Sequence, residues 1–288
     1  MSSTKITILI AIIASVITVI MLSSFSPTPS NMPKKESAFD RIMRTGVIRC
    51  GYYVFPPIMN KDANTGEMSG ITYDFMNNLA ERAGLKVEWT TEVTWSNSIA
   101  ELQTGRFDMI CTPQWPDIAM GRAVDFVDPS YYSGLFPIVR KNNKWSTATL
   151  SELNSPDVTF AIQDGASIDQ TTKMVFPKAK LQSLPPSASG GELYQLIISG
   201  KADSQITDRA GLWVFQKNNK EEFVLIEPEN PVKLQSYSMA VLKGETDLLN
   251  FLNFATREMD YSGDIDRILR KWEPEPGITY LRRAKSFQ

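Results

Sequence analysis

Strand-like and helix-like segments alternate along most of the chain, and this alternation narrows the choice of folds more than any single motif does. Three strands are expected at 47–53, 87–91 and 107–111, with helices at 71–83 and 96–104 between them. A βαβαβ order with connections this short is typical of a parallel sheet. The first part of the body is therefore expected to be an α/β unit.

A second set of alternating segments begins near Thr149. Its expected strands lie at 158–162, 180–184, 202–207, 223–226 and 238–241, and its expected helices at 165–174, 191–199, 211–216, 247–260 and 265–272. A polar tail is expected from Gly277 to the end. The two sets together predict two α/β lobes, each with helices on a mainly parallel sheet. Ligands of such sheets bind beyond the carboxyl ends of the strands, so a site between facing lobes is expected.

An apolar run near the N-terminus indicates that the chain is exported. Ile6–Leu22 contains 17 residues, almost all apolar, and follows a single positive charge at Lys5. A helix needs about 17–25 apolar residues to cross a bilayer core, so the run is expected to be either the core of a signal peptide or a short anchor. The Pro/Ser-rich stretch at 26–35 is expected to be a linker. Whether the run is cleaved or retained, the body is expected outside the cytoplasm, in the periplasm.

Composition excludes several classes of function. The 288 residues include no histidine, which excludes Ser-His-Asp and Cys-His catalysis and every histidine metal site. Two cysteines cannot build a structural zinc site, and no metal or cofactor is expected. The 30 basic residues do not exceed the 32 acidic ones, so the positive charge typical of a nucleic-acid-binding protein is missing.

The two cysteines leave two alternatives open. Cys50 and Cys111 fall on strands expected to be neighbours, and adjacent strands lie about 4.8 Å apart, which is within reach of a disulfide. The exported compartment is oxidising and would permit the bond. Cysteine also packs well as a small apolar residue, so two buried free thiols are the alternative.

Several sequence blocks are similar to motifs of one known family. They are CGYYVFPPI at 50–58, GEMSGITYDFMNNLAERAGLKVEW at 66–89, WSNSIAELQTGRFDMI at 95–110, RAVDFVDPSYYSG at 122–134, GKADSQITD at 200–208 and RILRKWEPEPG at 267–277. With these blocks in this order, residues 37–276 resemble the periplasmic solute-binding proteins of ABC importers, in the family that binds polar amino acids.

The resemblance implies an α/β, two-lobed periplasmic binding protein fold of type II, whose lobes close over a ligand. The implied division is a signal peptide or anchor with its linker at 1–36, lobe 1 at 37–131 and 238–280, lobe 2 at 132–237, and a polar tail at 281–288. The chain would cross between lobes near 131–134 and 235–238. The implied function is to bind a small polar solute, an amino acid or an amine-like molecule, and to deliver it to an ABC permease. A monomer is expected.

The resemblance also implies which residues contact the ligand. They are Tyr52, Phe55, Trp95, Trp115, Gln163, Gly165, Ser167 and Asp208. The aromatic residues would offer ring faces, the backbone N–H groups at 165–167 would bind an anionic group, and Asp208 would pair with an ammonium group. Each has a structural alternative, which is rim packing for the aromatic residues and helix capping for Asp208. The acids Asp74, Asp125 and Asp128 are expected to be structural.

One departure from the family pattern affects the expected ligand. The family places an arginine five residues before the Asp of the V-D-F motif, where it binds the ligand α-carboxylate. Counting back from Asp125 gives Met120, and Arg122 or Arg209 would be the substitutes. The sequence therefore favours a cationic or aromatic ligand over a free α-amino acid, through cation–π contacts of about 0.5–2 kcal/mol.

Two other functions stay open at this stage. The fold also includes dehydratases that act on cyclohexadienyl acids, for which Asp208 or Glu192 would serve as a general acid. A membrane-tethered sensor or interaction module with the same fold is the other alternative. The enzyme is disfavoured because the carboxylate-binding arginine is replaced by Met120.

Overall fold

The computed structural model describes residues 36–95, 97–186, 188–273 and 275–282. The predicted apolar run and its linker lie outside these residues. Among the residues described, no helix combines the length and the apolar character that spanning a membrane requires. The chain from Ala38 onward forms one compact unit, to which the following description applies.

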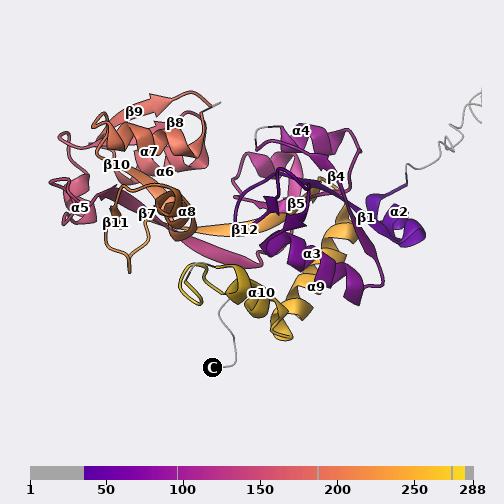
Figure 1. Cartoon of the computed structure of the whole chain (residues 1–288). Coiled ribbons are helices and arrows are strands. Elements are labelled where there is room, and N and C mark those ends of the chain that lie inside the picture. Colours follow the sequence, from indigo (N-terminus) through magenta and orange to yellow (C-terminus); the bar gives the residue numbers. More distant parts are fainter. Residues whose placement is uncertain (1–35, 96, 187, 274, 283–288) are drawn as a thin grey trace, which may run out of the picture. The chain divides into compact units, whose positions relative to one another are not determined.

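A mixed sheet runs through this unit (Figure 1). Its strands are β1 (Val47–Tyr52), β4 (Lys86–Glu92), β5 (Met109–Gln114), β6 (Val124–Phe126), β7 (Tyr131–Arg140), β8 (Thr159–Gln163), β9 (Lys180–Leu184), β10 (Ser204–Asp208), β11 (Phe223–Leu225) and β12 (Lys233–Leu242). The order among the described strands is β4-β1-β5-β12-β7-β10-β8-β9, with β6 paired to β12 and β11 paired to β7. A separate hairpin joins β2 (Asn60–Lys61) to β3 (Met68–Ser69).

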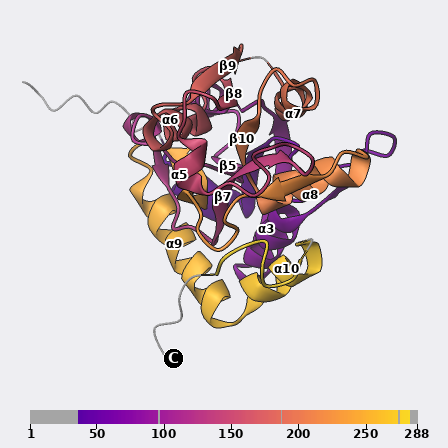
Figure 2. The ribbon, with the colours of Figure 1, turned by 90° about the vertical axis from the view of Figure 1, so that its left-hand side faces the viewer.

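In the first lobe, β1 pairs in parallel with both β4 and β5, as the sequence predicts. Its helices are α2 (Ala38–Thr45), α3 (Ile71–Arg82), α4 (Ser98–Gln103), α9 (Thr246–Tyr261) and α10 (Asp264–Trp272). The helices α3, α9 and α10 contact one another and lie together in both views (Figures 1 and 2). Their inward apolar residues, among them Phe75, Leu252 and Leu269, form one buried cluster with β1 and β5.

The start of α3 requires a glycine. Gly70 has a φ of 115°, which side chains rarely adopt, and a Cβ atom there would lie 2.8 Å from the carbonyl oxygen of Ile58. Gly84, with a φ of 67°, follows the end of the same helix, as a C-terminal glycine typically does. These two glycines therefore fix both ends of the helix that covers the first lobe's sheet.

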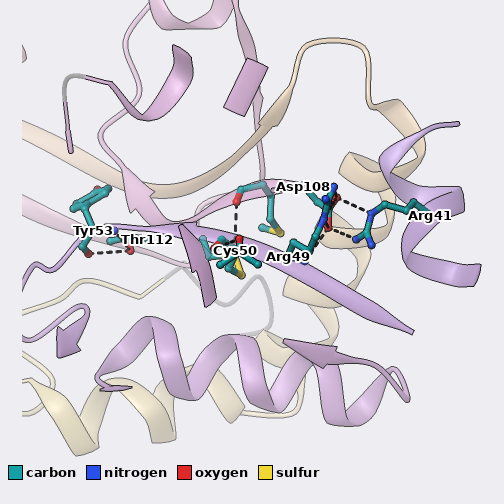
Figure 3. The surroundings of a disulfide bond; sticks show 9 residues. Arg41, Arg49, Cys50, Tyr53, Asp108 and Thr112 are labelled. Carbon is teal, nitrogen blue, oxygen red and sulfur yellow. Dashed lines mark hydrogen bonds and ion pairs between the residues drawn. A yellow bond between two sulfur atoms is a disulfide. The ribbon is translucent and has the colours of Figure 1, made fainter. Parts of the chain in front are cut away.

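A disulfide joins β1 to β5 inside this core (Figure 3). It links Cys50 to Cys111, and both residues are fully buried. The two alternatives left open by the sequence are thus resolved in favour of the bond. Beside it, Asp108 lies between the side chains of Arg41 and Arg49 (Figure 3).

In the second lobe, β8 pairs in parallel with both β9 and β10. The helices of this lobe are α5 (Leu150–Leu153), α6 (Ser167–Val175), α7 (Gly190–Ile198) and α8 (Arg209–Asn218). Apolar residues form one buried cluster on each face of this sheet, one around Phe160 and Phe176 and the other around Ala161 and Tyr194. A capping box between Ser189 and Glu192 begins α7, so Glu192 has a structural partner.

Two long antiparallel strands, β7 and β12, join the lobes. The first half of β12 pairs with β7, from Lys233 to Tyr237, and the second half pairs with β5, from Ser238 onward. The sequence predicted chain crossings at these two places but did not predict β7 as a strand. The lobe boundaries at 131/132 and 237/238 stay a prediction.

The chain after Gly277 differs from the expected polar tail. Tyr280 is fully buried, and Leu281 exchanges two backbone hydrogen bonds of 2.8 Å with Tyr132 in β7. Arg282 donates to both Glu273 and Asp266. Up to residue 282, therefore, this segment packs against the strands that join the lobes.

Candidate functional site

Three aromatic side chains meet beyond the carboxyl ends of β1 and β5. Phe55 follows β1, Trp115 follows β5, and Trp95 precedes α4. The ring of Trp115 meets the ring of Trp95 edge-on at 5.8 Å and that of Phe55 at 6.5 Å. These three residues are called the aromatic wall below. The sequence predicted all three as ligand contacts, and the structure brings them together.

The aromatic wall combines an exposed surface with a polar group. Trp95 is 45% exposed, although its ring also meets the ring of Tyr53 edge-on at 5.2 Å. The indole N–H of Trp115 is buried and has no hydrogen-bond partner among the described residues. The wall can therefore offer the exposed ring of Trp95 to a ligand.

A buried carboxylate lies behind the wall. Trp115 contacts Tyr237 at 6.1 Å between ring centroids, and the hydroxyl of Tyr237 donates a 2.7 Å hydrogen bond to Asp208. Asp208 is only 3% exposed, and within the described part of the chain it forms no ion pair with a lysine or arginine. Burial raises the pKa of Asp208, while the hydrogen bonds that it accepts act in the opposite direction.

Asp208 also caps a helix, as the structural alternative for this residue anticipated. Its Oδ1 accepts a 2.7 Å hydrogen bond from the backbone N–H of Gly211 at the start of α8. Its Oδ2 accepts from Ser133 at 3.3 Å as well as from Tyr237. Both oxygens are thus engaged inside the protein, and direct contact between Asp208 and a ligand stays a prediction.

The other second-lobe residues lie around the carboxyl end of β8. The side-chain amide of Gln163 donates to the carbonyl oxygens of Pro186 and Ala188, both at 2.8 Å, and so fastens the loop before α7. Gly165 is exposed with a φ of 78°, and Ser167 is the first residue of α6. The N-terminus of α6 has no side-chain cap. Contact of these residues with a ligand stays a prediction.

Tyr52 lies apart from the aromatic wall. It is 5% exposed, and its ring meets the ring of Trp89 edge-on at 5.9 Å. Its hydroxyl is 3.2 Å from Nζ of Lys61 and 3.4 Å from Glu92. The structure thus gives Tyr52 protein partners on another side of β1, and its predicted ligand contact remains untested.

The arginine position of the family, Met120, and the two possible substitutes, Arg122 and Arg209, show no contact with the aromatic wall among the described residues. Met120 packs against a second apolar cluster of the first lobe, which includes Tyr53 and Phe107, and its side chain has no hydrogen-bond donor. Arg122 is exposed. The guanidinium of Arg209 lies over the ring of Phe136 at 5.2 Å and donates to the carbonyl oxygen of Pro228 at 2.8 Å.

The three acids expected to be structural are confirmed as such. Each forms an ion pair within the first lobe: Asp74 with Lys271, Asp125 with Lys243, and Asp128 with Arg257. In the part of the chain that the structure describes, no group of three or more Cys, Asp or Glu residues is arranged to hold a metal ion.

Sequence reasoning missed Tyr237 and Ser133, which connect Asp208 to the strands that join the lobes. Both fall inside the predicted crossings, at 131–134 and 235–238. Their position next to Asp208 depends on the register of β7 against β10 and β12, which no local sequence signal gives.

Comparisons with known proteins agree on one family. A model described as bacterial extracellular solute-binding proteins, family 3, matches residues 48–275. The cyclohexadienyl dehydratase of Pseudomonas aeruginosa is 24% identical over 202 residues, which are 70% of this chain and 74% of the relative. The glutamine-binding protein of an ABC transporter in Bacillus subtilis is 26% identical over 217 residues, 75% of this chain and 76% of the relative.

Solved structures show the same fold. A structure described as an ancestral cationic amino acid solute binding protein matches with a TM-score of 0.63 and 32% identity, covering 82% of this chain and 99% of the other. The α/β fold with two lobes that the sequence predicts is therefore confirmed.

Proposed function

Because the chain belongs to the bacterial extracellular solute-binding proteins of family 3, we propose that it binds a small cationic solute on the aromatic wall, outside the cytoplasm. It would then deliver this solute to an ABC permease. We further propose that the protein acts as a monomer. Contacts from the second lobe, at Gln163, Gly165 and Ser167, would form when the lobes close over the solute.

The observation that carries this proposal is the pairing of the aromatic wall with a buried carboxylate that has no cationic partner in the described part of the chain. Ring faces attract cations, by roughly 0.5–2 kcal/mol for each favourable contact. Tyr237 links Asp208 to Trp115, because its hydroxyl donates to Asp208 and its ring contacts that of Trp115. Asp208 itself is buried and has no cationic partner among the described residues. In a buried setting its charge is weakly screened, so it favours a positive ligand at the wall.

The same geometry disfavours ligands that need their α-carboxylate to be bound by the protein. A carboxylate that loses its water on binding needs charged donors in return. Met120 has none, and Arg209 is turned toward Phe136 and Pro228. A relative described as binding cationic amino acids supports the positive group, while the missing arginine favours amines without a carboxylate.

Calorimetry with putrescine, a betaine, arginine and glutamine tests this ligand class. We expect putrescine, which has no carboxylate, to bind more tightly than glutamine or the betaine, because an unpaired carboxylate at a binding site costs about 2–5 kcal/mol. Met120→Arg should improve the binding of arginine and glutamine. Micromolar binding of glutamine by the unmodified protein, lost in Arg122→Ala or Arg209→Ala, would contradict the ligand class and leave solute binding intact.

Loss of one aromatic ring should weaken binding without unfolding the protein. Trp95→Ala is expected to cost about 1–3 kcal/mol of putrescine affinity, as for a central aromatic contact at an interface. Trp213→Ala is the matched control, because Trp213 is 39% exposed, lies on α8 and has Lys217 over its ring. Equal affinities of the two variants would refute the role of the wall.

We also infer that the protein is not a dehydratase, although one relative is named as such. Glu192 is exposed and its pKa is lowered, chiefly by a hydrogen bond from the backbone N–H of Ser189, so it is a poor general acid. The pKa of Asp208 is raised, but both its oxygens have protein partners. Incubation with prephenate should give no product, and turnover abolished by Asp208→Asn would overturn this inference.

A further inference from the structure

One buried carboxylate receives hydrogen bonds from both strands that join the lobes. Asp208 Oδ2 accepts from Tyr237 in β12 at 2.7 Å and from Ser133 in β7 at 3.3 Å. Its Oδ1 accepts from Gly211 in α8. The three side chains of Asp208, Tyr237 and Ser133 belong to residues that are at most 3% exposed. A second-lobe helix and both crossing strands are thus held by a single group.

Tyr237 occupies the point where β12 changes partner. It pairs with Tyr131 of β7, and the next residue, Ser238, pairs with Gln114 of β5 in the first lobe. The Tyr237 ring is stacked on that of Tyr131 at 4.7 Å and meets Trp115 edge-on at 6.1 Å. The same side chain therefore contacts the aromatic wall through its ring and Asp208 through its hydroxyl.

We propose that Tyr237 is a positioning residue that couples occupancy of the aromatic wall to the crossing strands. The inference rests on the proposed function of the wall. A ligand that shifts the Trp115 ring also shifts the Tyr237 ring packed against it, because buried side chains transmit displacements at close contact. Asp208 has no cationic partner among the described residues, so losing a hydrogen bond would leave its buried charge poorly compensated. When the Tyr237 hydroxyl moves, the Asp208 carboxylate therefore moves with it. The hydrogen bonds from Ser133 and Gly211 pass this movement on to β7 and α8.

Tyr237→Phe is the direct test because it removes the hydroxyl and keeps the ring against Trp115. Tyr131→Phe is the matched control, because the ring of Tyr131 is stacked on that of Tyr237. The hydroxyl of Tyr131 is buried and has no hydrogen-bond partner among the described residues. Spin labels on Lys86→Cys in the first lobe and Lys201→Cys in the second report the distance between lobes. Both sites are exposed, and the disulfide keeps the native cysteines from being labelled.

Without ligand, we expect Tyr237→Phe to broaden the distance distribution between the labels and Tyr131→Phe to leave it unchanged. The dissociation constant for putrescine should rise about tenfold in Tyr237→Phe and less than twofold in Tyr131→Phe, as expected for a lost hydrogen bond to a charged group. Identical distributions and affinities in the two variants would overturn the proposal.

A replacement variant and a measurement without ligand cover the cases in which Tyr237→Phe does not fold or no amine binds. If Tyr237→Phe does not fold while Tyr131→Phe does, Ser133→Ala takes its place. Broadening in Ser133→Ala supports the coupling, and an unchanged distribution overturns it. If the unmodified protein binds no amine, the proposed ligand class fails, yet the distributions measured without ligand still decide whether Tyr237 holds the crossing strands.

Discussion

Asp108→Ala should lower the free energy of unfolding by about 3 kcal/mol, because it leaves two partly buried guanidinium groups without their shared anion. The Asp108 side chain is 1% exposed, while the side chains of Arg41 and Arg49 are 18% and 28% exposed. Asp108 accepts hydrogen bonds from Nε of Arg41 at 2.9 Å, from Nη2 of Arg49 at 2.8 Å and from the backbone N–H of Arg49 at 2.8 Å. Because both arginines reach water, the expected loss is at the lower end of values for buried pairs.

Urea unfolding followed by circular dichroism measures this effect. Glu222→Ala is the control, since its ion pair with Lys141 is exposed on both sides and should contribute less than about 1 kcal/mol. A loss of similar size in both variants would show that the buried cluster around Asp108 contributes no more than a surface pair.

The parallel halves of the sheet were predictable because their signals are local. β1 and β5 are short strands rich in apolar residues, and β4 alternates Val87 and Trp89 with polar residues. The two helices between these strands are followed by Gly84 and Gly105. Strands that are joined by a helix through short connections usually lie parallel to one another in the same sheet. The pairing of β1 with β4 and β5 follows from this pattern without any long-range information.

The strand β7 could not be predicted in the same way, because it contains Gly134 and Pro137. A Cβ atom at Gly134 would lie 2.6 Å from the ring of Phe136, which would have to shift to admit a side chain there. Pro137 has no backbone N–H to donate, and it lies near the end of the pairing between β7 and β11. Its carbonyl oxygen faces β11 and accepts a hydrogen bond from the backbone N–H of Ile226. Both residues usually interrupt strands, and only the tertiary setting makes them compatible with this one.

The aromatic part of the candidate site followed from sequence position, but its polar part did not. Phe55 lies shortly after β1 and Trp115 directly after β5, and these strands are parallel neighbours, so the proximity of the two rings is a consequence of the sheet. Tyr52 ends β1, and because strand residues alternate between faces its ring lies against Trp89. Its contact with a ligand stays a prediction. The link from Tyr237 to Asp208 joins residues 29 positions apart through strand register, which no motif encodes.

Reduction of the disulfide between Cys50 and Cys111 should destabilise the protein by about 4 kcal/mol. The bond closes a loop with a sequence separation of 61, and the chain-entropy model assigns about this much free energy to a loop of that length. Comparing the oxidised and reduced forms of the unmodified protein by urea unfolding isolates the bond, since both sulfur atoms remain in the core. The transition midpoint should move to a lower urea concentration on reduction.

A double variant, Cys50→Ala with Cys111→Ala, provides the control, because its stability should not respond to reductant. Thiol titration of the denatured, unreduced protein should find no free thiol, since both cysteines of the chain are joined in the structure. Two free thiols before reduction would contradict the bond. In that outcome Cys50 and Cys111 would act as buried apolar residues, and the tie between β1 and β5 would rest on strand pairing and packing alone.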